Sequence, residues 1–141
     1  MKRLPVIGVL CAAAVFGLSA CSDDSSPSED ATKAASALCA DLSELKGDTA
    51  KLKALDPSSA TKDQVKDAQQ AVQDDWNSVK TNASQMKEAE RSAVQSATED
   101  LKKAWDDVPG DTTGKDALTM LQPQIQKLDQ ATTAAAAGLK C

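Results

Sequence analysis

Large apolar residues recur every three or four positions in four successive stretches of the chain, which is the spacing of one face of an α-helix. We expect helices over about residues 28–55, 61–81, 84–108 and 115–139. No stretch alternates apolar and polar residues as a half-buried strand does, so the fold class is predicted to be all-α. The expected inward positions are Leu38, Leu42, Leu45, Leu52 and Leu55, then Val65, Ala68, Val72, Trp76 and Val79, then Met86, Ala89, Val94, Ala97, Leu101, Trp105 and Val108, and finally Leu118, Leu121, Ile125, Leu128, Ala135 and Leu139.

Residues that start and stop helices separate these stretches. Ser26-Pro27-Ser28-Glu29 and Thr61-Lys62-Asp63-Gln64 match helix starts, in which a side chain caps the first turn. Asp56-Pro57 and Pro109-Gly110 match helix stops, because proline disfavours a helical residue before it. The connections are therefore short, which predicts antiparallel neighbours in an up-down four-helix bundle.

The segment 81–84 leaves two arrangements open. Thr81-Asn82-Ala83-Ser84 is the weakest point of the helical pattern between residues 61 and 108. A turn there gives four helices, whereas one continuous helix over 61–108 gives three, with the outer two folded back toward its middle. We favour the turn, because the long helix exposes more of a core that is already thin.

The first twenty residues have the pattern of an export signal. The basic start Lys2-Arg3 precedes an uncharged apolar run from Leu4 to Ala20, and acidic sequence follows at once. Leu18-Ser19-Ala20-Cys21 resembles the lipobox of bacterial lipoproteins. In that family the cysteine thiol receives a diacylglyceryl group and the chain is cut before the cysteine. The resemblance implies a signal peptide over 1–20 and a lipidated Cys21 that anchors the exported chain on the outer face of the cell membrane.

The sequence that follows Cys21 is polar and acidic. Residues 21–27 are small and hydrophilic and are interpreted as a tether, which leaves 28–141 as one folded domain. Removal of Lys2 and Arg3 with the signal leaves 14 of the 16 basic residues against 21 acidic ones, a net charge near −7. Such a surface is repelled by nucleic-acid phosphates and gains nothing from anionic headgroups. We expect contact with the membrane through the lipid and no nucleic-acid partner.

Two cysteines remain for the folded domain, since Cys11 leaves with the signal and Cys21 carries the lipid. Cys39 and Cys141 are an even pair in an oxidising compartment, which predicts a disulfide. A reactive thiol or a metal-binding pair is the alternative, and neither the spacing nor any histidine supports it. The bond also fits the topology, because an up-down-up-down bundle starts its first helix at the end where its fourth finishes.

The whole pattern resembles small secreted or lipid-anchored helical proteins of actinobacteria. The shared features are a cysteine near the start of the first helix, an Asp-Pro break, a Trp in each central helix, a Pro-Gly break and a terminal cysteine. That family carries no assigned activity. The resemblance therefore implies an architecture and an exported location, without a reaction.

Acidic residues gather at the last connection and suggest a surface cation site. Its candidate ligands are Asp106, Asp107, Asp111 and Asp116. Their spacing does not match a calcium-binding loop, because Leu118 occupies the place of the bidentate glutamate. The alternative is ordinary turn chemistry, with negative charge favourable to the dipole of the last helix.

No catalytic set is visible in the sequence. The chain has no His and no Tyr, and both domain cysteines are expected to be oxidised, so nucleophilic catalysis lacks a base and a thiol. Asp74-Asp75 and Glu99-Asp100 lie among other charges and are interpreted as solvated pairs on the outer face. We expect no enzyme, no cofactor and no metal.

Trp76 and Trp105 are the only aromatic residues beyond the signal, since the single Phe is Phe16. They are interpreted as core or half-buried packing, with anchors for a protein partner as the alternative. Two aromatic residues predict no surface for base or sugar stacking.

The favoured function is a membrane-anchored, non-enzymatic interaction or scaffold module of the cell envelope, whose envelope protein partner the sequence does not identify. The alternative is a small-ligand or cation carrier that uses the acidic turn over 106–116 or the bundle interior.

Overall fold

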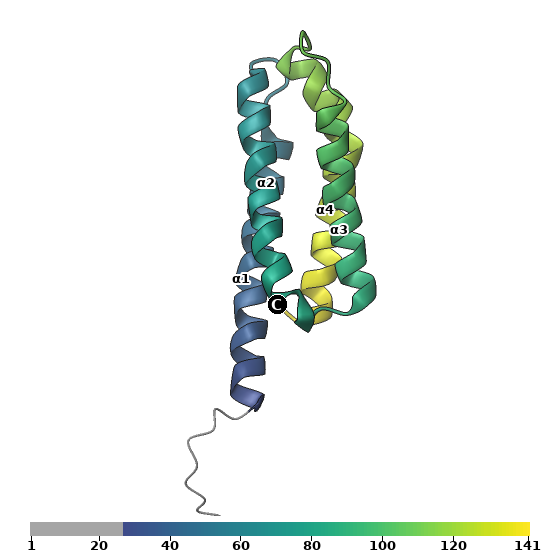
Figure 1. Cartoon of the computed structure of the whole chain (residues 1–141). Helices are drawn as coiled ribbons and strands as arrows, with labels where there is room; N and C mark the ends of the chain where they lie inside the picture. Colours follow the sequence, from purple (N-terminus) through teal and green to yellow (C-terminus); the bar gives the residue numbers. More distant parts are fainter. Residues whose placement is uncertain (1–26) are drawn as a thin grey trace, which may run out of the picture.

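The computed structural model describes residues 27–141, which form an antiparallel bundle of α-helices (Figure 1). The predicted signal peptide, the lipidation site Cys21 and the tether up to residue 26 lie outside the described residues. Within them no strand is present, so the all-α prediction is confirmed. The elements are α1 (Pro27–Ala54), α2 (Lys62–Asn82), the 3₁₀ turn η1 (Ala83–Gln85), α3 (Glu88–Asp106) and α4 (Gly114–Leu139).

The connection between α2 and α3 is a turn, so the single long helix over 61–108 is wrong. α2 ends at Asn82, η1 makes one tight turn, and Lys87 in extended backbone precedes α3. Ala83 and Met86 are buried in this connection, and their burial favours the turn over an exposed continuous helix. The third helix consequently begins at Glu88, four residues later than predicted.

The predicted start of α2 is present as a complete capping box. The Thr61 side chain accepts a hydrogen bond from the backbone N–H of Gln64, and the Gln64 side chain accepts one from the N–H of Thr61. Thr113 caps α4 with one of these two bonds, because its side chain accepts from the N–H of Asp116. These local hydrogen bonds satisfy backbone N–H groups that have no partner within the first turn of a helix.

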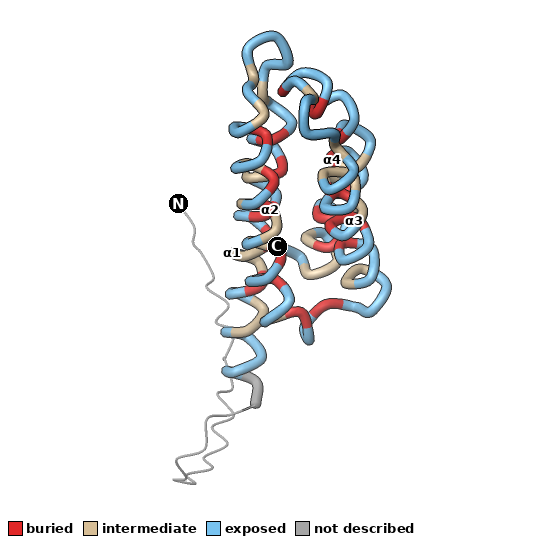
Figure 2. Tube along the Cα trace, turned by 45° about the horizontal axis from the view of Figure 1, so that its top comes forward, coloured by how far each residue is buried: buried red, intermediate tan, exposed pale blue. Residues whose placement is uncertain are grey.

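The predicted apolar stripes form the core, and buried positions face the interior along the helices (Figure 2). Ala89 is an exception, because α3 has barely begun there and its side chain faces solvent. Several predicted core residues are only half-buried since they lie at helix ends or along the edges of the bundle. These are Leu55, Ala68, Trp105, Val108 and Leu139.

The helices do not pack equally against one another. α1 packs closely on α2 and α3 closely on α4, and α1 also contacts α4 along much of its length. α2 and α3 share a smaller interface. The bundle thus consists of two helical hairpins that are joined more tightly on one side than on the other.

The predicted disulfide joins Cys39 of α1 to Cys141 just after α4, with the two Cα atoms 5.5 Å apart. Lys140 ends α4 in a left-handed conformation with φ of 60°, and the N–H of Cys141 bonds to the carbonyl of Ala136. Before Cys39, α1 continues past the end of the bundle as a helical stalk, residues 27–37 (Figure 1). No described helix is long and apolar enough to cross a membrane.

Candidate functional site

The end of the bundle opposite the stalk is formed by two connections, residues 55–61 and 107–113, which we name the tip (Figure 1). The Lys62 ammonium donates to the carbonyl oxygens of Pro109 and Gly110, at 2.6 and 3.1 Å. Gly114 packs against backbone of the first connection, since a Cβ added to it would lie 2.1 Å from the carbonyl oxygen of Ala60. The two connections are therefore packed against each other and linked by hydrogen bonds.

The four aspartates predicted as a cation site have separate environments near the tip. Asp106 pairs with Lys102 on its own helix at 2.6 Å. Asp116 accepts from the Thr113 hydroxyl at 2.8 Å, as part of the start of α4. Asp107 and Asp111 are exposed. Among residues 27–141 no three Asp, Glu or Cys side chains are gathered for a metal ion.

A small hollow of about 180 Å³ lies beside the tip, between the end of α1 and the start of α4. Its apolar lining includes Leu52, Leu55, Leu118 and Ile125, and Lys53 and glutamines of α4 form its rim. Its volume is below the range of ordinary small-molecule pockets.

A larger groove of about 640 Å³ lies between α2 and α3, where the two hairpins share the smaller interface. Trp105 lines it and is half-buried, whereas Trp76 is only 4% exposed and belongs to the core. Both positions agree with the predicted core or half-buried packing, since Trp105 also packs against the core. The groove is lined by Gln69, Gln70, Gln73, Asp74, Asn77, Lys102, Trp105 and Asp106.

The amide side chains of this groove were not among the residues that the sequence singled out. One signal was present, since Gln69 stands four residues after Val65 and three before Val72, within an apolar stripe. A polar residue at such a position requires a partner. Gln73 has one, because its Nε2 donates to the backbone carbonyl of Thr98 at 3.2 Å.

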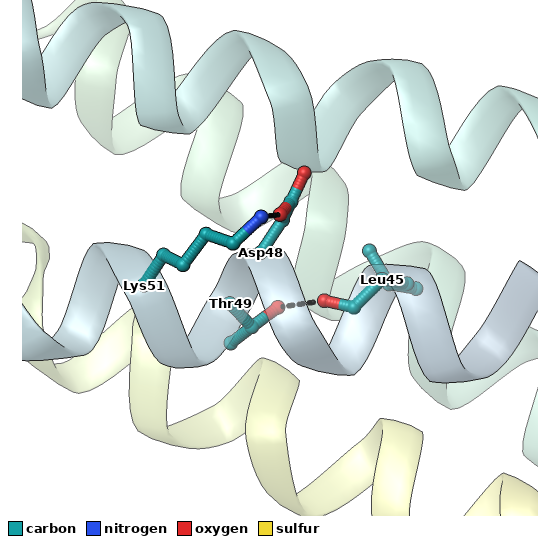
Figure 3. Close-up of polar contacts among 4 residues, drawn as sticks. All are labelled: Leu45, Asp48, Thr49 and Lys51. Carbon is teal, nitrogen blue, oxygen red and sulfur yellow. Dashed lines mark hydrogen bonds and ion pairs between the residues drawn. The ribbon is translucent and has the colours of Figure 1, made fainter.

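Three acidic residues lie together where α1 faces α2: Asp75 of α2 and Glu44 and Asp48 of α1, which we name the acidic group. Asp75, predicted to be solvated, is half-buried, and its Oδ2 is buried with no hydrogen-bond partner among the described residues. Burial, together with the negative charges of Asp48 and Glu44, raises the pKa of Asp75 to about 6. Figure 3 shows Asp48 directed from α1 toward α2, where Lys51 pairs with it.

Comparisons with protein-family models, with curated proteins and with solved structures give no match.

Proposed function

We propose that this chain is an exported lipoprotein that acts as a non-enzymatic interaction module on the outer face of the cell membrane. In this proposal, the signal peptide 1–20 is removed and the lipid on Cys21 holds the chain at the membrane. The folded domain then contacts another protein of the cell envelope.

The observation that supports the proposal is the difference between the two ends of the bundle. The stalk, with which the described chain begins, lies at one end, and the tip lies at the other (Figure 1). Residues 29–37 alone add roughly 14 Å of helix before the disulfide, at 1.5 Å per residue. If the chain is anchored at Cys21, the tip is therefore the part of the domain that lies farthest from the membrane.

The build of the tip supports a contact role as well. Its two connections are held together by the bonds of Lys62 and by the close approach of Gly114 to Ala60. A surface that is ordered before binding loses less conformational entropy when a partner docks. Ion pairs between helices, Lys53 with Asp129 and Lys127 with Asp100, brace the sides of the bundle.

Site-specific photo-cross-linking in cells tests the proposal. A photoreactive residue at Asp111 in the tip is expected to capture one dominant envelope protein, and the same residue at exposed Gln130 in α4 is the matched control. Equal capture from both positions contradicts a contact role for the tip. A purified protein that turns over a defined substrate, and loses turnover on substitution of one carboxylate, contradicts the non-enzymatic assignment.

The anchor is tested separately with Cys21→Ser. The variant is expected in the medium, or as unprocessed precursor in the membrane, because the thiol that accepts the lipid is gone. A processed Cys21→Ser protein that stays in the membrane contradicts the lipoprotein assignment. Membrane fractionation with intact-mass analysis distinguishes these outcomes.

A further inference from the structure

The groove between α2 and α3 has the size of a small-molecule site. Its volume of about 640 Å³ lies inside the range of ligand pockets, roughly 300–1,000 Å³. It exists because polar side chains occupy facing positions of the two helices. Gln73 meets a backbone carbonyl of α3 there, so apolar packing does not close the interface.

Gln69 is the unusual residue of this groove. The residue as a whole is 3% exposed, and within the described part of the chain its side-chain amide has no hydrogen-bond partner, although its amide atoms are not fully enclosed by protein. The amide is therefore open to the groove, where water or a ligand can form hydrogen bonds with it. Because Gln69 lines the groove, its amide offers one donor group and one acceptor to whatever occupies that space.

The charges of the groove disfavour ionic ligands. Lys102 and Asp106 pair with each other, which leaves Asp74 as the uncompensated charge of the lining. A phosphate or carboxylate ligand would be repelled by that aspartate. A metal ion would lack ligands, since no three Asp, Glu or Cys side chains among residues 27–141 are placed to hold one.

The remaining lining residues favour a neutral ligand that is rich in hydroxyl groups. Gln69, Gln70, Gln73 and Asn77 supply amides, which both donate to and accept from hydroxyls. Trp105 is the one apolar side chain of the lining, and an aromatic face suits the apolar face of a sugar ring. A peptide in a groove needs several apolar anchor pockets, which this lining does not provide.

We infer that the groove between α2 and α3 binds a neutral saccharide of about one to three rings, with Gln69 at its floor and Trp105 at its wall. The site is separate from the anchor and from the tip, so it goes beyond the interaction proposed above. The low aromatic count predicted no sugar-stacking surface. The structure nevertheless places one of the two tryptophans in a groove with four amides.

Tryptophan fluorescence tests this inference on the processed, lipidated protein in a detergent without a sugar headgroup. The substitution Trp76→Phe leaves Trp105 as the only tryptophan, and the chain has no tyrosine. The probes are neutral trisaccharides: chitotriose, cellotriose, maltotriose and mannotriose. At least one is expected to shift the Trp105 emission saturably at millimolar concentration or below.

The variant Gln69→Met, made in the same background, separates binding from folding. It is expected to weaken saccharide binding at least tenfold and to leave Tm unchanged, because methionine is similar in size and the lost amide makes no hydrogen bond to the rest of the described protein. Gln130→Met, at an exposed position of α4, is the control and is expected to change neither quantity. Circular dichroism confirms that each variant is folded.

Three results would overturn the inference. The first is the absence of saturable binding by all four trisaccharides up to tens of millimolar. The second is binding that Gln69→Met leaves unchanged in a folded protein. The third is a Gln69-dependent response to neutral tripeptides or to calcium that the saccharides do not produce, since this would assign the groove to another class of ligand.

Discussion

The two ends of the bundle are held together in different ways. At the stalk end, a disulfide joins Cys39 of α1 to Cys141, just after α4. At the tip, Lys62 and Gly114 make the contacts between two short connections, without a covalent bond. The difference follows from the topology. Each connection of the tip joins two helices that are consecutive in the sequence, whereas the disulfide joins α1 and α4, which are separated by the whole of the bundle.

The largest expected effect comes from breaking the stalk end. The double variant Cys39→Ala/Cys141→Ala removes a bond that spans 102 residues, and we expect a loss of about 4–5 kcal/mol in the free energy of unfolding. Urea unfolding followed by circular dichroism measures it. Reduced wild type should match the variant, and a midpoint equal to that of the oxidised wild type would show that the bond adds no stability.

Substitution at Gly114 breaks the tip. Gly114→Ala places a Cβ against the carbonyl of Ala60 and should cost about 1–3 kcal/mol, because backbone must move to admit it. Gly47→Ala is the matched control, since a Cβ at Gly47 has open space around it. There alanine should add about 0.5–1 kcal/mol through its better helix propensity. The same sign for both variants would refute the packing at the tip.

A smaller effect is expected between the two ends, at Asp75. Burial and the charges of Asp48 and Glu44 raise the pKa of Asp75 from 3.8 in the unfolded chain to about 6 in the folded one. The folded state therefore binds this proton more tightly, and the contribution of Asp75 to stability increases as the pH falls from about 7 to 4.

Asp75→Asn should remove this dependence and stabilise the protein at pH 8 by about 1 kcal/mol, a value reduced for the solvent that screens a partly exposed carboxyl. Urea midpoints at pH 4, 6 and 8 measure both effects. Asp74→Asn, at the exposed neighbouring position, is the control. A pH dependence between 4 and 7 that is unchanged in Asp75→Asn would contradict this assignment.

The smallest effect is expected from Lys62→Met at the tip. The variant loses two hydrogen bonds to backbone carbonyls, and it also removes a positive charge from the start of α2, where the helix dipole disfavours it. These changes oppose each other, so we expect a net loss of about 0.5 kcal/mol. Exposed Lys66→Met is the control. A loss as large as that of Gly114→Ala would contradict the expected cancellation between the lost hydrogen bonds and the relieved helix dipole.

The local features of this fold were predictable from the sequence. Helical spacing of leucines and valines located the four helices, and the Thr61–Gln64 capping box marked the start of α2. The parity of the cysteines and the direction of successive helices predicted the Cys39–Cys141 bond. Periodicity and capping depend on neighbours within about four residues, which is the reason that a single sequence reveals them.

The groove and the acidic group depended on tertiary structure. Periodicity shows that Gln69 faces inward, but it does not show that α2 and α3 leave a space where its amide lies unpaired beside Trp105. Likewise, Asp75 has a raised pKa because α1 brings Asp48 and Glu44 to it. The sequence by itself determined which residues form helices and which face of each is apolar. The lateral pairing of the helices decided which polar residues are buried together, because that pairing joins residues distant in the chain.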